Sequence, residues 1–159
     1  MQAKVLLCDY AEVAQNKLFI TGANINRLGV QPSEPPYGVN IALAISVTIP
    51  WNATNQQHVM TIELVSDQGG GTSERVPLSG MLPPNHDPAD NGMIVAAFNA
   101  GRAPDMTPGE DTLIPIAIPI FGLPLPHPGS YFFNIRIDGT DVDRVSFRVD
   151  IMNPGFMQL

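Results

Sequence analysis

The 159-residue chain is poor in cysteine and in positive charge. Its single Cys excludes a disulfide within the chain. Eight Lys and Arg residues are scattered among 15 Asp and Glu residues, and the formal net charge is −7. Because no basic stripe is present to neutralise a row of phosphates, we expect neither nucleic acid nor an anionic membrane as a partner.

Long hydrophobic runs are also missing. The run VLLC near the start is too short for the core of a signal peptide, and no run approaches the roughly 18 residues needed to cross a bilayer. We therefore expect a cytoplasmic protein, in which the sequon at Asn52 carries no glycan.

The common motifs of enzymes and metal sites are absent from the sequence. There is no GxSxG, no P-loop and no GxGxxG that opens a helix. His58, His86 and His127 lack a metal-ligand spacing, and the oxygen-rich segment 85–91 lacks the full spacing of a calcium loop. We expect no catalytic residue, metal or cofactor, and a calcium- or zinc-dependent module ranks last among the functions considered.

Proline, glycine and apolar residues, by contrast, are abundant. The chain has 16 Pro and 14 Gly, and it is 44% hydrophobic but only 14% charged. This composition is typical of a β protein with frequent turns. A chain of this length is served by one core, so we expect a single domain over residues 1–159.

Side chains that alternate with a period of two predict the strands. Segments 39–49 and 58–65 both alternate, and we expect them to be neighbouring strands. Segments 131–137 and 145–151 alternate on either side of the turn DGTD, which predicts a hairpin. Weaker strand candidates are 75–78 and 93–100, separated by the Pro- and Asp-rich loop 81–92.

The run TLIPIAIPIF carries two prolines at the same parity, Pro115 and Pro119. In an extended strand, both missing N–H groups lie on one side, and that side cannot be paired continuously. The run is therefore predicted to lie at the edge of a sheet, where proline blocks association.

These features together predict an all-β fold. About eight or nine short strands, with no helix of core-forming length, favour a two-sheet antiparallel sandwich, with a closed barrel as the alternative. Residues 128–131, PGSY, are similar to the tyrosine corner of immunoglobulin-like sandwiches, and we expect a sandwich of that type.

The stretch LLCDYAEVAQNKLFITGA, residues 6–23, places a thiol beside carboxylates. Cys8 and Asp9 point to opposite faces of a strand, so they cannot act as a nucleophile and its base. Asp9 and Glu12 have the spacing of a capping box, which predicts one helical turn over 10–15 ended by Asn16 in a left-handed conformation. Cys8 is expected to be a small buried hydrophobe.

Trp51, the only tryptophan, follows Pro50 at the end of a predicted strand. It either plugs the end of the sandwich or marks a binding surface. His58 shares the inward parity of Met60, so a hydrogen-bonded histidine at the rim of the core is the favoured interpretation. The candidate binding residues are Trp51, Asn52, Asn55, His58, Asp9 and Glu12.

Three stretches together resemble a family of small bacterial proteins, common in actinobacteria, that is described as a domain of unknown function. They are LLCDYAEV…KLFITGA, PWNATNQQH and GLPLP…GSYFFNIRIDG. The resemblance is collinear over most of the chain. It implies a cytoplasmic single-domain β protein and carries over no activity, cofactor or catalytic residue. The chain departs from the family in its longer insertion MLPPNHDPADNG.

The function that we expect is a non-enzymatic binding or self-assembly module, either a homo-oligomer or a partner of another protein. The motif-poor chain has a high apolar content for one core, including segments 93–98 and 156–159. The alternative is a small-molecule-binding protein or hydrolase with a pocket near Trp51, His58 and Asp9.

Overall fold

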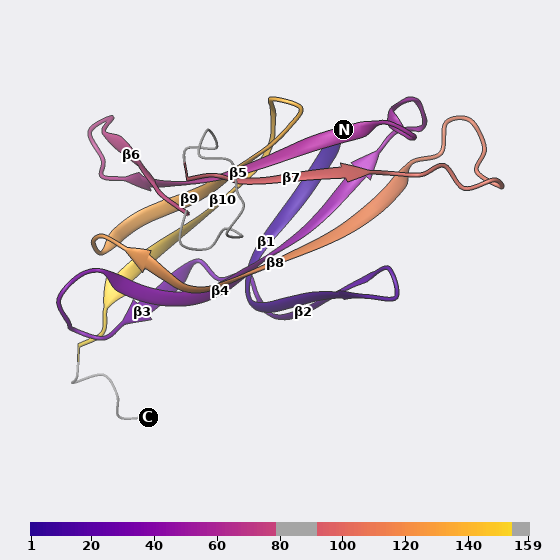
Figure 1. The fold of residues 1–159 in the computed structure, drawn as a ribbon. Coiled ribbons are helices and arrows are strands. Elements are labelled where there is room, and N and C mark those ends of the chain that lie inside the picture. The colour runs from indigo at the N-terminus through magenta and orange to yellow at the C-terminus, as the bar shows by residue number, and fades with distance from the viewer. Residues whose placement is uncertain (79–91, 154–159) are drawn as a thin grey trace.

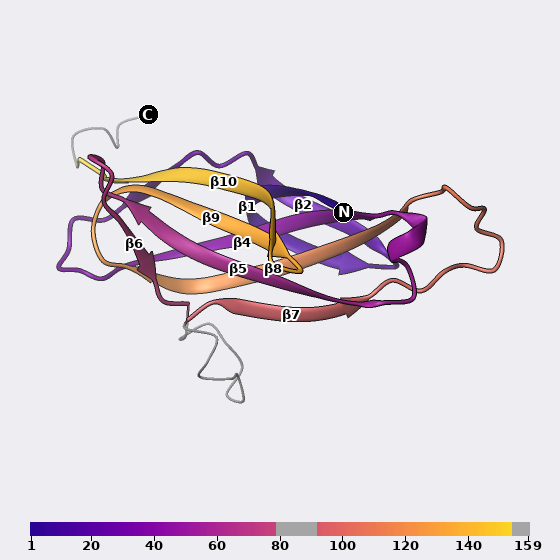
Figure 2. The ribbon, with the colours of Figure 1, turned by 90° about the horizontal axis from the view of Figure 1, so that it is seen from above.

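Two stacked β-sheets make up the fold in the computed structural model, which describes residues 1–78 and 92–153 (Figure 1, Figure 2). These ranges contain ten strands and one short 3₁₀-helix. The predicted all-β, two-sheet sandwich is confirmed, and the sheets do not close into a barrel. Within these ranges no helix has the length and apolar character needed to span a membrane.

The first sheet, sheet A, is antiparallel throughout. Its strands in spatial order are β2 (Lys17–Ala23), β1 (Gln2–Ala14), β4 (Tyr37–Ile49) and β8 (Thr112–Leu125).

The second sheet, sheet B, combines antiparallel pairs with the parallel pair β3–β10. Its strands in spatial order are β3 (Arg27–Val30), β10 (Thr140–Ile151), β9 (Gly129–Ile137), β5 (Gln57–Asp67) and β6 (Ser73–Val76), while β7 (Ile94–Asn99) pairs with the other half of the β5 edge that β6 occupies.

The main core fills the space between the sheets. Large apolar side chains of β4 point inward at every second position, and they meet those of β5 and β9. Members of this core that are almost fully buried include Ile41, Leu43, Ile45, Met60, Ile62, Leu64, Phe133 and Ile135.

The small residues of β4 lie on its outer face, where other side chains pack closely against them. Ala42 and Ala44 form a second buried cluster with Cys8 and Ala11 of β1. Leu18 of β2 and Ala117 of β8 pack against this cluster. The hairpin of β1 and β2 therefore folds against the outer face of sheet A, and the expected burial of Cys8 is confirmed.

Side chains from sheet B and the loops satisfy backbone groups of β1 that β2 does not pair. The carboxylate of Asp143, at a bulge of β10, accepts a hydrogen bond from the N–H of Val5 at 2.7 Å. The N–H of Ile25 donates to the carbonyl of Leu7 at 3.2 Å. These bonds tie the two sheets together along one side of the sandwich.

Two strand predictions are confirmed. The C-terminal hairpin is β9–β10, joined by the turn residues Asp138 and Gly139, which both have positive φ. The proline-containing run is β8, at the edge of sheet A. The hydroxyl of Tyr131 donates to the carbonyl of His127, as expected for a tyrosine corner, while the immunoglobulin-like type stays a prediction.

The expected pairing of segments 39–49 and 58–65 is wrong. β4 lies in sheet A and β5 lies in sheet B, and the 3₁₀-helix η1 (Trp51–Ala53) carries the chain from one sheet to the other. Alternation reports which face of a strand is buried, but it does not report which strand lies beside it.

The predicted helical turn over 10–15 is also wrong, because β1 continues as far as Ala14. Pairing with β2 gives this segment a ladder of backbone hydrogen bonds, whereas a single helical turn would be costly to nucleate. Asn16 has the expected positive φ of 58°, but it forms a hairpin turn with Gln15. This division into β1 and β2, together with the short β3, raises the strand count above the predicted eight or nine.

Two segments noted in the sequence lie outside the described residues. They are the Pro- and Asp-rich loop 81–92 up to residue 91, with its oxygen-rich segment 85–91, and the apolar segment 156–159.

The second buried cluster predicts a size limit at Ala44. We expect Ala44→Leu to lower the free energy of unfolding by about 1–3 kcal/mol, because the added atoms must displace the packed hairpin. Ser46→Leu, on the same face of β4 but half-buried, should have a smaller effect. Urea unfolding of both variants provides the measurement, and equal effects would contradict the packing of the hairpin on Ala44.

Candidate functional site

The outer face of sheet B carries a charged network centred on Glu63 of β5. This carboxylate is almost fully buried, and Arg75 of β6 donates to it through Nε and Nη2 at 3.1 and 2.7 Å. Arg136 of β9 lies 3.0 Å from the other oxygen of Glu63, and it also bonds Asp141. Hydrogen bonds from Asn134 and Arg136 lower the pKa of the Asp141 carboxyl. The charges on this part of sheet B are therefore mutually satisfied.

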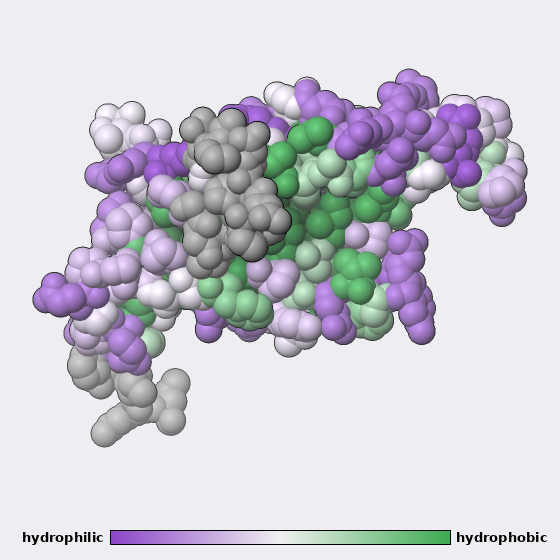
Figure 3. Space-filling view, in the orientation of Figure 1, coloured by the Kyte–Doolittle hydropathy of each residue, from purple (hydrophilic) through white to green (hydrophobic). Residues whose placement is uncertain are grey.

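The side of the molecule formed by sheet A has the opposite character. β4 and β8 contain no charged residue. Several large apolar side chains of sheet A are nevertheless well exposed, up to 61% for Leu113 and Phe121 and 50% for Phe19. Figure 3 views the sandwich from the edge formed by β7 of sheet B and β8 of sheet A, and it shows hydrophobic residues gathered along that edge. We call the exposed set of Val13, Phe19, Ile20, Leu113 and Phe121, which lie on both faces of the β1–β2 hairpin and on β8, the apolar side.

Trp51 is held in a tight local structure by Arg102. The guanidinium lies 3.8 Å from the centre of the indole ring, and it donates to the carbonyl of Trp51 and to the hydroxyl of Thr54, both at 2.8 Å. The side chain of Asn55 accepts the N–H of Arg102, while its own N–H donates to the carbonyl of Ala100. Trp51, Thr54 and Asn55 therefore hold the segment that follows β7, at Ala100 and Arg102, against the turn after β4.

His58 is buried, with both ring nitrogens hydrogen-bonded. Nε2 lies 2.7 Å from the carbonyl of Ala53, and Nδ1 lies 2.7 Å from the carboxylate of Asp138. Both partners are acceptors, so both bonds are complete when both nitrogens carry a proton and the ring is an imidazolium. The Ala53 and Asp138 bonds raise the pKa of His58, while the Val59 N–H and His58 hold the pKa of Asp138 low.

The six candidate binding residues fall into two groups. Trp51, Asn52, Asn55 and His58 lie in or beside the turn between β4 and β5, where Asn52 contributes its carbonyl to Gln56.

Asp9 and Glu12 form the other group, on β1. The Asp9 carboxylate lies against Gly22, where a Cβ would come within 2.0 Å of it, and Glu12 accepts a hydrogen bond from the hydroxyl of Tyr10 at 3.0 Å. Four surface hollows lie elsewhere, and none of the six residues lines them. The binding role of the six stays a prediction.

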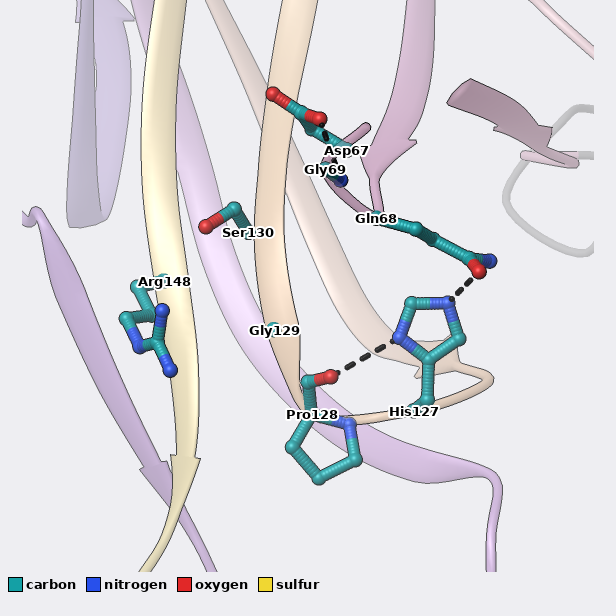
Figure 4. A pocket seen from close by; sticks show the side chains of 8 residues that line it. All are labelled: Asp67, Gln68, Gly69, His127, Pro128, Gly129, Ser130 and Arg148. Carbon is teal, nitrogen blue, oxygen red and sulfur yellow. Dashed lines mark hydrogen bonds between the residues drawn. The ribbon is translucent and has the colours of Figure 1, made fainter. Parts of the chain in front are cut away.

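One of these hollows, of about 420 Å³, contains the residue types of a hydrolytic triad (Figure 4). Asp67, His127 and Ser130 line it, but their bonds go elsewhere. Nδ1 of His127 donates to the Pro128 carbonyl at 3.0 Å, and Nε2 faces Gln68 at 3.2 Å. Asp67 accepts the N–H of Gly69. This arrangement provides a polar surface but no activated nucleophile.

Metal binding has no geometric support in the part of the chain that the structure describes, where no three His, Cys, Asp or Glu side chains gather. Arg102 and Asp138 are the residues that organise the turn after β4, and sequence reasoning missed both. Asp138 was visible only as a turn residue, and nothing in the spacing links Arg102 to Trp51.

The fold defines the protein as an all-β two-sheet sandwich. The profile of the family of unknown function DUF6941 matches residues 4–150, and the chain belongs to this family. The family membership expected from the resemblance is confirmed; a bacterial origin stays an expectation.

Solved structures give only distant likenesses. The chain aligns with Pseudomonas fluorescens alkylpurine DNA glycosylase AlkC at 12% identity and a TM-score of 0.38, covering 91% of this chain and 30% of that one. Listeria innocua β-glucosidase with laminaribiose aligns at 10% identity and a TM-score of 0.41, covering 95% and 16%. The chain thus spans less than a third of either protein. No curated protein matches.

The His58–Asp138 bond predicts a pH dependence of stability. Its contribution is complete below about 6.5, the ordinary pKa of histidine, and is lost as the pH rises through the raised pKa of the folded protein. At the acidic end, the lowered pKa of Asp138 makes its contribution complete above 3.8 and lost as the pH falls through the lowered value. Urea unfolding measured from below pH 3.8 to above pH 6.5 should therefore show a loss of stability at each end of the range. Asp138→Asn should flatten the alkaline loss, and an unchanged slope in this variant would contradict the assignment.

The clamp on Trp51 predicts a fluorescence change. Arg102→Lys keeps the charge but loses the planar group that bonds Trp51 and Thr54, so we expect a loss of about 1–3 kcal/mol of stability. Because Trp51 is the only tryptophan, its emission should shift to the red and acrylamide should quench it more. Arg148→Lys on β10 is the matched control. Identical spectra for the two variants would refute the clamp.

Proposed function

We propose that the protein is a non-enzymatic binding module that assembles with further copies of itself through its apolar side. The observation that supports this most is the concentration of exposed Phe19, Leu113 and Phe121 on a sheet whose strands β4 and β8 carry no charge. Exposed apolar surface of this kind marks an interaction site in soluble proteins.

The contrast with sheet B supports the choice of surface. There Glu63 is paired with Arg75 and Arg136, and the Arg144 guanidinium stacks on Phe132 at 3.4 Å. Such a face needs no partner to cover it. Because interface centres are depleted in charged residues, the apolar side suits association better.

A second copy is a suitable partner because closed homo-oligomers are the commonest assemblies of soluble proteins. The net charge of −7 makes nucleic acid a poor partner. We place the module in the cytoplasm, in keeping with its one buried free thiol, Cys8.

Native mass spectrometry and sedimentation test this proposal. The unmodified protein should show a multiple of the 17.1 kDa chain mass at micromolar concentration. Phe19→Ser combined with Ile20→Ser should weaken association by about tenfold or more, because an exposed aromatic anchor such as Phe19 dominates interface energies. Arg144→Ser combined with Arg148→Ser on sheet B is the control and should leave the number of chains in the assembly unchanged. A protein that stays monomeric throughout would overturn the proposal.

A further inference from the structure

β2 forms an edge of sheet A that no strand in the described ranges covers. Nearly all of its side chains are exposed, including Phe19 at 50% and Ile20 at 38%. β7, another edge strand, exposes only alternate residues because its other face packs on the core. Soluble proteins protect an apolar edge strand of this kind, and pairing with a further strand is one way to do so.

The turn before β2 determines which of its backbone groups face outward. Gln15 and Asn16, with φ of 50° and 58°, form a two-residue turn between Ala14 and Lys17. In such a hairpin the flanking residues are a hydrogen-bonded pair. Alternation then directs the N–H and C=O groups of Leu18 and Ile20 away from β1.

The opposite edge of sheet A is blocked. On β8, proline stands opposite Ser46, Ala42 and Gly38 of β4, and proline has no N–H to donate to a further strand. β2 contains no proline. Sheet A therefore accepts another strand at β2 and resists one at β8.

We propose that β2 pairs with β2 of a second copy, antiparallel about a two-fold axis at Phe19; this inference rests on the proposed self-assembly. Phe19 then faces Phe19 of the other copy, Leu18 faces Ile20, and Lys17 faces Thr21. The outward groups of Leu18 and Ile20 form two hydrogen-bonded pairs, and the Phe19 pair lies between them at the closer spacing of a non-hydrogen-bonded pair.

The charges on the hairpin suit a second copy. In this register Lys17 meets the uncharged Thr21, so like charges do not oppose each other. Beyond Thr21 lies Tyr10, its partner on β1, whose hydroxyl holds the Glu12 carboxylate at 3.0 Å. With strands spaced about 4.8 Å apart, the long Lys17 side chain of one copy extends toward the Glu12 carboxylate of the other. The axis repeats this pairing of opposite charges.

The assembly also closes. Pairing at β2 gives one continuous sheet that runs from β8 of one copy to β8 of the other, so the blocked proline edges lie at both ends. An isologous contact with blocked outer edges ends at two copies. We therefore expect a dimer and not a filament.

Cysteine cross-linking tests the register. Phe19→Cys should form a covalent dimer under mild oxidation, because the two Cβ atoms face each other across the axis. Thr21→Cys, on the same face and two residues away, should cross-link at least about tenfold less, because its partner is Lys17. Cys8 is fully buried and does not compete. Equal cross-linking of both variants would overturn the register.

Proline substitution tests the edge pairing itself. Ile20→Pro removes an outward N–H, and proline is tolerated on an edge strand, so the variant should fold but lose at least about tenfold in dimer affinity relative to Ile20→Thr, which keeps the N–H. Circular dichroism confirms folding, and sedimentation measures the affinity. If the unmodified protein is a dimer and Ile20→Pro dimerises as well as Ile20→Thr, edge pairing is overturned while self-assembly stands. If the unmodified protein is monomeric at every concentration, both proposals fall.

Discussion

Open sheets must protect the backbone groups along their edges, and this requirement governs the present structure. Sheet A treats its two edges in opposite ways. β8 carries prolines at the positions opposite Ser46, Ala42 and Gly38, and because proline has no N–H, β8 cannot pair continuously with a further strand. β2 has outward backbone groups, exposed Phe19 and Ile20, and no proline. The same asymmetry supports both the proposed self-assembly and its proposed end at two copies.

The rest of the molecule serves as a stable frame for this edge. Asp143 ties β1 to the other sheet through the N–H of Val5. The turn after β4 is fixed by the stacking of Arg102 on Trp51 and by the bond between His58 and Asp138. Buried polar groups with satisfied hydrogen bonds hold such connections in one conformation. His58, Asp138 and Arg102 thus serve to hold the turn after β4 in place.

Much of the fold could be predicted from the sequence, but less of the site could. Alternation identified β4, β5, β9 and β10, and the parity of Pro115 and Pro119 placed β8 at an edge. Pairing was harder, because a period of two gives no information on neighbours, so β4 and β5 were wrongly placed side by side. The spacing of Asp9 and Glu12 matched that of a helix start, but the segment is a strand because it pairs with β2. That pairing depends on contacts between strands, which the local spacing does not report. The partnership of Arg102 with Trp51 spans 51 positions and leaves no local signal.

Residue-resolved amide exchange on β2 would test the central claim most directly. The outward N–H groups of Leu18 and Ile20 should be protected at high protein concentration and exchange rapidly on dilution, because they are bonded only when a second copy is present. The N–H of Ala117, which lies between the two prolines on the blocked edge of β8, serves as an internal reference and should exchange at the same rate throughout. Rapid exchange of Leu18 and Ile20 at every concentration would contradict the account.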